Sequence, residues 1–178
     1  MNTPRTTALP WAALTIALAL TLAGCPRADP PPAGGEPPPA DRWLQGDAER
    51  IEIAGEAFLL ELALDEAKRF RGLSDRATIP ADAGMLFVFP DAAERAFVMR
   101  DCLVPIDIIY LDADGRILTM HEMQVEPYGR AEFLLRRYRS NGRAQFVIEL
   151  AGGSIHRLGL SEGDNLELPL GELKARAR

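Results

Sequence analysis

A proline-rich segment at residues 26–40 constrains the fold of this chain more than any other sequence feature. Seven of its fifteen residues are proline and two are glycine. Such a segment cannot bury apolar area, and it favours an extended polyproline II conformation with a flexible break at Gly34-Gly35. We therefore predict a tether here, which could reach roughly 45 Å at ~3.1 Å per residue. The folded domain is expected over residues 41–173, with a short tail at 174–178.

The segment before the tether has the pattern of an export signal. Residues 11–23 are apolar except for Thr15 and Thr21, and such a run is too short to cross a hydrocarbon core of ~30 Å. It ends in Leu22-Ala23-Gly24-Cys25, which resembles the lipobox of bacterial lipoproteins. This resemblance implies removal of residues 1–24, lipidation of the Cys25 thiol, and an exported protein that a lipid anchor holds on a membrane, facing the periplasm or the cell exterior.

Composition limits the function classes that fit the chain. Hydrophobic residues make up 47% of it and the net charge is −6. The hydrophobic content predicts that the part after the tether folds around a core. The negative net charge disfavours nucleic acid as a partner, because an acidic surface repels phosphates.

Short apolar runs separated by turn residues predict an α+β domain that is mostly antiparallel, compact and barrel-like, with one or two short helices. Turn signals predict three hairpins, which pair residues 50–53 with 57–64, 85–89 with 95–99, and 106–111 with 116–120. Further strands are expected at residues 145–150 and 166–168. Capping residues predict a helix after Asp65 that stops at Gly72, and a helical turn over residues 154–158.

Several ordered motifs resemble the DUF192 family, also called UPF0127. They are Arg71-Gly72-Leu73, Gly84-Met85-Leu86-Phe87-Val88-Phe89-Pro90, the run from Phe97 to Ile109, Asp112-Ala113-Asp114-Gly115-Arg116-Ile117, and Val147-Ile148-Glu149-Leu150-Ala151-Gly152-Gly153. The resemblance covers residues 58–168. It implies a compact β-rich domain that is often exported, and it implies no particular activity.

The candidate ligand-binding residues are Arg71, Arg100, Asp101, Asp107 and His121. Asp107 opens an apolar run, where a carboxylate is costly unless it is paired. One interpretation is a structural ion pair with Arg100 or Arg71. The other is a small polar pocket, in which arginines hold a carboxylate, phosphate or sugar group.

Other chemistry-bearing residues favour structural roles. Cys102 lies among Leu103, Val104 and Pro105, where a cysteine behaves as a small buried hydrophobe, although His121 could serve as its base. The Asp112-x-Asp114-Gly115 spacing does not fit a calcium loop and indicates a hairpin turn. The sequence therefore predicts no metal site and no cofactor.

Two functions remain open. The first is a non-catalytic binding or accessory module on the cell envelope, for a small polar ligand, a glycan or a protein partner. The alternative is an envelope enzyme that uses a polar pocket around Arg100, Asp107 and His121. The absence of a serine–histidine–aspartate, phosphate-loop or paired-histidine metal motif favours the first.

Overall fold

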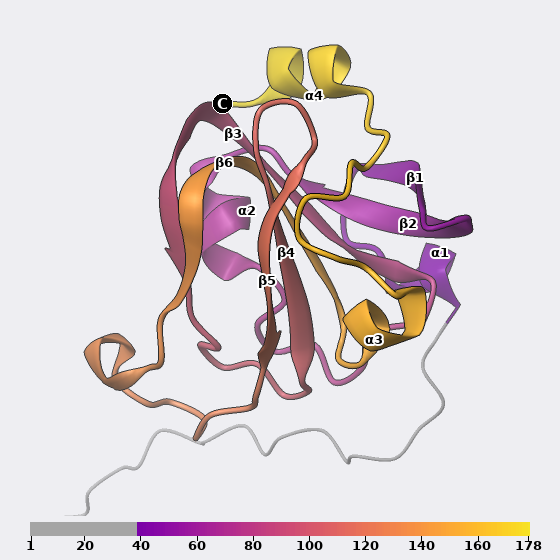
Figure 1. Cartoon of the computed structure of the whole chain (residues 1–178). Helices are drawn as coiled ribbons and strands as arrows, with labels where there is room; N and C mark the ends of the chain where they lie inside the picture. The colour runs from indigo at the N-terminus through magenta and orange to yellow at the C-terminus, as the bar shows by residue number, and fades with distance from the viewer. Residues whose placement is uncertain (1–38) are drawn as a thin grey trace, which may run out of the picture.

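A computed structural model describes residues 39–178, so the leader, Cys25 and most of the tether lie outside the described residues. A six-stranded sheet with the order β1-β2-β3-β6-β4-β5 organises the domain (Figure 1). Its strands are β1 (Ala48–Ile53), β2 (Glu56–Ala63), β3 (Ala83–Phe97), β4 (Ile106–Leu111), β5 (Ile117–Met123) and β6 (Tyr138–Ala151).

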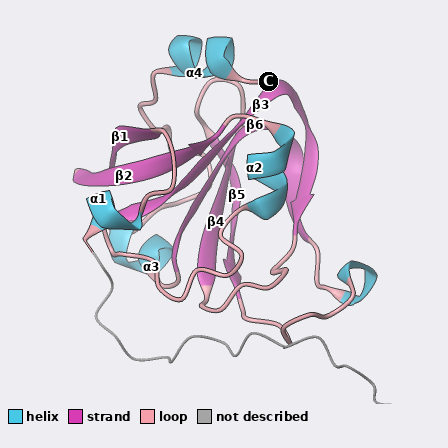
Figure 2. Ribbon diagram, turned by 180° about the vertical axis from the view of Figure 1, so that it is seen from behind, coloured by secondary structure: helices cyan, strands magenta, loops and turns pink. Residues whose placement is uncertain are grey.

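Short helices surround the sheet (Figure 2). They are α1 (Ala40–Trp43), α2 (Glu66–Arg71), the 3₁₀ helix η1 (Glu132–Leu134), α3 (Ser154–Leu158) and α4 (Leu170–Arg176). The expected α+β class is confirmed. The helices α1 and α4 were not expected, because neither begins with a residue whose side chain caps the helix: Pro39 precedes α1 and Pro169 precedes α4.

The elements with strong local signals are confirmed. The β1–β2 and β4–β5 hairpins pair in antiparallel register around Gly55 and Gly115. The Asp65 side chain caps α2 by accepting a hydrogen bond from the Lys68 backbone N–H at 2.8 Å. Gly72 follows α2 with a φ of 51°, a conformation that glycine adopts without steric cost.

The barrel-like expectation is wrong, because the sheet is open. Strands β1 and β5 are its two edges and do not pair with each other. The β2–β3 pair is parallel, whereas the other strand pairs are antiparallel. A parallel pair requires a long crossover connection, and residues 64–82, which include α2, supply it.

The expected hairpin of residues 85–89 with 95–99 is also wrong. Both segments up to Phe97 belong to the single strand β3, which continues through Pro90 and pairs with β6. Its register shifts between Val88 and Ala93 and again between Glu94 and Ala96. Bulges tolerate a proline, because the missing N–H falls where the ladder is already interrupted.

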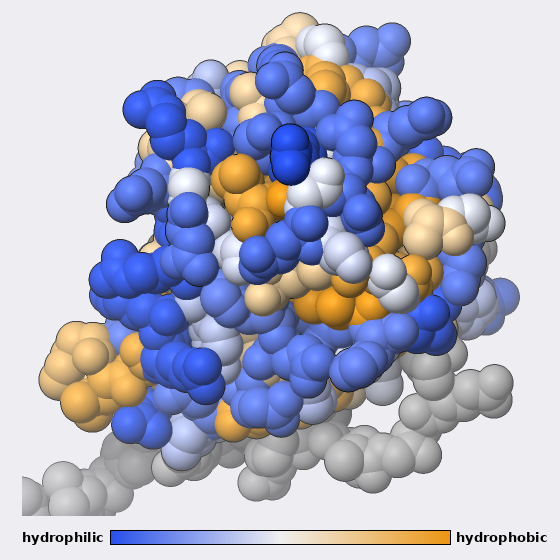
Figure 3. Space-filling model, in the orientation of Figure 1, coloured by the Kyte–Doolittle hydropathy of each residue, from blue (hydrophilic) through white to orange (hydrophobic). Residues whose placement is uncertain are grey.

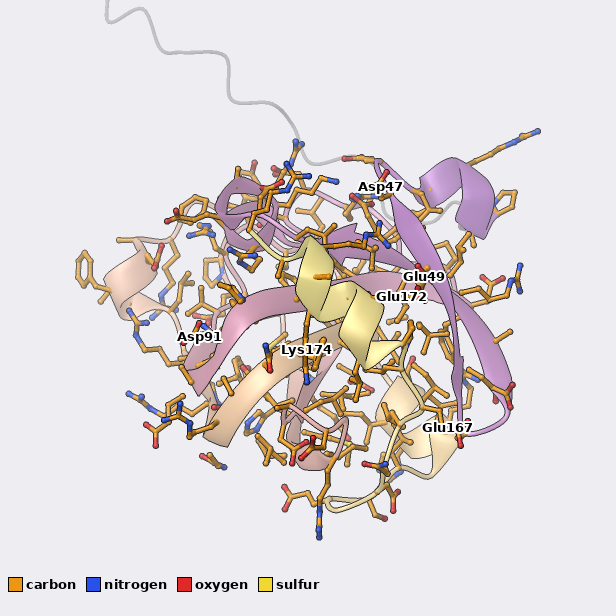
Figure 4. All side chains as sticks on the ribbon, turned by 90° about the horizontal axis from the view of Figure 1, so that it is seen from above. Asp47, Glu49, Asp91, Glu167, Glu172 and Lys174 are labelled. Carbon is orange, nitrogen blue, oxygen red and sulfur yellow. The ribbon has the colours of Figure 1, made fainter. Side chains whose placement is uncertain are left out.

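The C-terminal segment differs from the expected strand at residues 166–168. An isolated bridge between Arg116 and Asn165, together with a few backbone hydrogen bonds, joins this region to the sheet without forming a strand. The chain then forms α4, which lies over one end of the sheet (Figure 4). Lys174 extends from α4 and donates a hydrogen bond to the Ala113 carbonyl at 2.7 Å. Arg176 lies 3.4 Å from Glu49 on β1, so α4 ties the C-terminus to two distant parts of the domain.

Both faces of the sheet are buried. One core contains Met85, Phe87, Ile108, Tyr110 and Val147, and is covered by α1 and the loops that follow α2 and β3. The other core contains the side chains that alternate with these along the same strands. Side chains of β1 and of residues 155–173 complete it. Among residues 39–178, no helix is long and apolar enough to cross a membrane.

Candidate functional site

A pocket of about 300 Å³ lies on the face of the sheet that carries α2. Its wall is formed by α2 and residues 72–74, by the distal part of β3, and by Arg100, Cys102 and Glu132. Glu149, in the middle of β6, also lines it. The pocket therefore combines segments that are far apart in the sequence and that the sheet topology brings together.

The bend in β3 gives the pocket an aromatic wall. The strand curls at its register shifts, and the Phe97 ring packs edge-to-face on Phe87, with centroids 4.9 Å apart. The Phe89 ring lies 6.5 Å from Phe97 in a similar arrangement. Phe87 is fully buried, whereas Phe89 and Phe97 are half-buried. The Phe89 ring already stacks against the guanidinium of Arg95 at 3.5 Å and lies 5.1 Å from that of Arg69. The partly exposed ring of Phe97 is therefore the one more open to a ligand.

Glu149 is the most unusual group in the pocket. Its side chain points from β6 into the apolar core that contains Phe87 and Tyr110, and the residue is only 4% exposed. Its Oε2 atom is buried, and none of the described residues supplies a hydrogen-bond partner for it. Burial raises the pKa of Glu149 to about 8. At neutral pH the group is thus mostly a neutral carboxyl, which can both donate and accept a hydrogen bond.

Three arginines line the pocket, and they differ in how many interactions their side chains already make with other residues. Arg69 is fixed by hydrogen bonds to the Leu64, Val88 and Arg178 carbonyls at 2.7–3.0 Å. Arg100 donates to Glu132 at 2.6 Å, donates to the Phe70 carbonyl, and stacks over the Phe70 ring at 3.7 Å.

Arg71 differs from the other two arginines of the pocket because its guanidinium is not held by neighbouring described residues. It lies at the end of α2, and its side chain is exposed. Within the part of the chain that the structure describes, its side chain makes neither a hydrogen bond nor an ion pair. Its guanidinium is therefore available to bind an anion in a bidentate manner without first breaking another interaction.

The Cys102 thiol is unsuited to act as a nucleophile. The residue is buried, and its Sγ lies 3.5 Å from the Arg100 carbonyl. Burial, together with the nearby Glu149 and Asp101, raises the pKa of Cys102 to about 12. Because only the thiolate reacts readily, Cys102 serves as an apolar wall of the pocket. Burial and Glu149 also raise the pKa of Tyr110, whose hydroxyl donates to the Tyr138 carbonyl at 2.8 Å.

The structure brings together only two of the five residues that the sequence suggested. Arg71 and Arg100 line the pocket. Asp101 lies outside it, where its carboxylate accepts a hydrogen bond from the Gly129 N–H at 2.7 Å. The expected ion pair of Asp107 with Arg71 or Arg100 is not formed, because Arg100 pairs with Glu132 instead.

Asp107 has a structural environment. Its carboxylate accepts a hydrogen bond from the Ile155 N–H at 2.8 Å, at the start of α3, and the N–H groups of Gly153 and Ser154 also interact with it. The residue is 1% exposed. Burial raises the pKa of Asp107, and the backbone hydrogen bonds oppose this increase. Asp107 thus attaches α3 to β4.

His121 faces a different part of the surface. Its Nε2 lies 2.8 Å from the Arg139 carbonyl, which can only accept a hydrogen bond, so this nitrogen carries a proton. The ring lies 6.0 Å from the ring of Tyr110 and 5.7 Å from that of Tyr138. It lines a shallow depression with Glu122 and Arg136, and that depression shares no residue with the pocket of Glu149.

Sequence reasoning missed Glu149, although a signal was present. The residue interrupts the apolar run Phe146-Val147-Ile148, just as Asp107 interrupts its own run. A strand between two covered sheet faces has no solvated side, so every position along it is buried. A carboxylate at such a position needs a partner or a function. Among residues 39–178, no group of three or more histidine, cysteine or carboxylate side chains is placed to hold a metal ion.

The described domain thus combines an open mixed sheet, a pocket with an aromatic wall, and a buried carboxyl that lines this pocket. A family model places the chain more specifically. Residues 49–168 match DUF192 (Uncharacterized ACR), and the chain belongs to this family. A search of curated proteins found no match.

Two solved structures resemble the domain. A candidate transcription regulator from Sinorhizobium meliloti 1021 is 33% identical, with a TM-score of 0.57, over 66% of this chain and 89% of that protein. A protein of unknown function from Novosphingobium aromaticivorans DSM 12444 is 28% identical, with a TM-score of 0.58, over 68% of this chain and 83% of that protein. The matched domain makes up most of both solved chains.

Proposed function

We propose that the domain is a non-catalytic binding module, and that the pocket of Glu149 binds a small organic anion. The observation that carries this proposal is the unpartnered Oε2 atom of Glu149 inside a pocket with an uncommitted arginine at its mouth. An unsatisfied buried polar atom costs about 1–3 kcal/mol. A ligand that supplies the missing hydrogen bond recovers this free energy on binding.

The lining of the pocket defines the ligand chemistry. The neutral carboxyl of Glu149 matches a hydroxyl or an amide of the ligand. The half-buried ring of Phe97 matches an apolar face, such as that of a sugar ring or an aromatic ring. The guanidinium of Arg71 matches a carboxylate or a phosphate. Uronic acids, sugar phosphates and aromatic hydroxy acids combine these three features.

The environment of the other candidate residues gives no support for an enzyme. Asp107 is engaged at the start of α3, and His121 lies in a separate depression. An acid–base pair requires groups that can reach the same substrate atom. The acidic net charge also gives no support for extending the name of the Sinorhizobium protein, a candidate transcription regulator, to this chain.

A thermal-shift screen of residues 39–178 tests the binding proposal. The screen would contain glucuronic acid, glucose 6-phosphate, 4-hydroxybenzoate and neutral glucose. We expect an anionic compound to raise the melting temperature, and neutral glucose to have a much smaller effect. The variant Arg71→Gln should weaken binding of the active compound by about tenfold or more, whereas Arg50→Gln, an exposed arginine on β1, should leave it unchanged. Equal binding by Arg71→Gln would refute the assigned role of Arg71.

We also propose that the module works on the cell envelope as a lipoprotein anchored through Cys25. The sequence Leu22-Ala23-Gly24-Cys25 and the tether after it support this proposal. Mass spectrometry of the mature cellular protein tests it. We expect a chain that begins at a lipidated Cys25, and a Cys25→Ser variant that is not lipidated. Residues 1–24 still attached to an unmodified Cys25 would contradict the proposal.

A further inference from the structure

The loop between β5 and β6 carries an apolar surface that the ligand-binding proposal does not use. Residues 125–137 leave the sheet and form η1 (Figure 1). Phe133 on η1 is 81% exposed and Leu134 is 53% exposed. In Figure 3 the apolar patch at this corner stands out from a hydrophilic surround. Burying one large apolar side chain is worth about 1.5–3 kcal/mol, so solvent exposure of this pair is unfavourable.

The same loop is basic although the chain is acidic. Residues 125–137 contain three arginines and two glutamates, a net charge of +1, and Arg139 follows at the start of β6, whereas the whole chain has a net charge of −6. The two glutamates are neutralised locally: Glu126 lies 3.5 Å from Arg130, and Glu132 lies 2.6 Å from Arg100. Arg137 is exposed and makes no side-chain hydrogen bond or ion pair within the described part of the chain.

We propose that this loop docks on an anionic phospholipid surface, with Phe133 and Leu134 inserted among the headgroups. The apolar side chains lie on a projecting tip, and not in a groove that would fit a peptide. Exposed arginines beside bulky apolar residues are the combination that binds a membrane interface, because insertion and attraction to anionic lipid add together. Charge alone would also suit a second copy of the acidic chain, so the projecting apolar tip is what favours a lipid surface over that copy.

The helix η1 contacts the rim of the pocket, so docking of the loop would also position the pocket. Glu132 on η1 holds Arg100, which in turn stacks on Phe70 at the rim of the pocket. A docked loop would therefore place the mouth of the pocket close to the membrane surface. A module positioned in this way would sample ligands at the surface rather than in bulk solution.

Vesicle co-sedimentation of residues 39–178 tests the proposal. This fragment lacks Cys25, so the result does not depend on lipidation, and it requires no ligand in the pocket. We expect binding to vesicles of phosphatidylglycerol and phosphatidylcholine, and little binding to vesicles of phosphatidylcholine alone. The double variant Phe133→Ser, Leu134→Ser should reduce binding by about tenfold or more. Both side chains are exposed, so its melting temperature should stay close to that of the unmodified fragment.

Charge variants provide a matched comparison. Arg137→Glu should weaken vesicle binding by about fivefold or more. Arg50→Glu changes the charge equally but lies on β1, on the opposite side of the molecule in Figure 1, and should leave binding unchanged. Failure of the unmodified fragment to bind anionic vesicles would overturn the proposal. So would a fragment that dimerises through Phe133 and Leu134 and does not bind vesicles, because its loop would then be a protein interface.

Discussion

Replacing Glu149 by glutamine should make the stability of the domain less sensitive to pH. The folded protein keeps a proton on Glu149 up to about pH 8, whereas an unfolded glutamate loses it near pH 4.5. Between these values the folded state binds more protons than the unfolded state, so this group makes stability fall as pH rises. Above pH 8 both states are ionised, and the difference becomes constant. Glu149→Gln removes this contribution altogether.

The size of the effect follows from the width of that interval. The interval spans 3.5 pH units, and each unit corresponds to about 1.36 kcal/mol. The free energy of unfolding of Glu149→Gln, relative to that of the unmodified domain, should therefore increase by up to about 5 kcal/mol between pH 4.5 and pH 8. Roughly 3 kcal/mol of this increase should be present by pH 7. The amide adds an offset of its own, so the growth with pH is the quantity that tests the reasoning.

Urea unfolding at pH 5, 6, 7, 8 and 9, followed by circular dichroism, measures this growth. Glu61→Gln is the matched control, because Glu61 is also a buried glutamate of the sheet but lies 2.8 Å from Arg76. That variant leaves a buried arginine without its partner and should be destabilised at every pH in the series. A free-energy difference between Glu149→Gln and the unmodified domain that stays flat within about 1 kcal/mol from pH 5 to pH 8 would show that Glu149 is not a buried, unpaired carboxyl.

Three further perturbations test other parts of the structure. Arg76→Met should lower the free energy of unfolding by about 3–5 kcal/mol, because it leaves Glu61 buried without its ion pair; a loss below 1 kcal/mol in urea unfolding would contradict this. Gly84→Ala should destabilise by about 1–3 kcal/mol or more, since a Cβ there would lie 2.3 Å from a backbone carbonyl oxygen of β6; an unchanged melting temperature would be inconsistent with this contact. Cys102, with its pKa raised to about 12, should resist iodoacetamide at pH 8 in the folded domain and react once urea unfolds it; rapid labelling of folded protein would count against its burial.

The elements that the sequence predicted correctly are those set by neighbouring residues. The β4–β5 hairpin depends on the Asp112–Gly115 turn, in which Asp112 accepts hydrogen bonds from the backbone N–H groups of Asp114 and Arg116. The helix α2 depends on its cap at Asp65 and on the glycine that follows it. Such signals act over a few residues and do not need the rest of the fold.

The features that the sequence did not reveal depend on distant parts of the chain. Strand β3 passes through Pro90 because β6 remains its partner on both sides of the bulges. The Arg100–Glu132 pair joins residues 32 positions apart, and Asp107 contacts a backbone N–H 48 positions away. The pocket itself depends on three-dimensional packing, so of its residues only Arg71 and Arg100 were proposed as ligand-binding from the sequence, although the carboxylate of Glu149 in an apolar run was also a visible signal.

The open sheet leaves two edges that could recruit strands from other molecules. On β1, the edge carries the charged residues Glu49, Arg50 and Glu52, and ionic side chains on an edge strand oppose intermolecular pairing. On β5, the backbone of Ile117 already exchanges hydrogen bonds with Asp164 and Gly163 at 2.8 and 2.9 Å. The irregular segment before α4 therefore covers the start of the β5 edge, and a chain truncated before residue 161 would leave the backbone groups of Ile117 free to pair with a strand of another molecule.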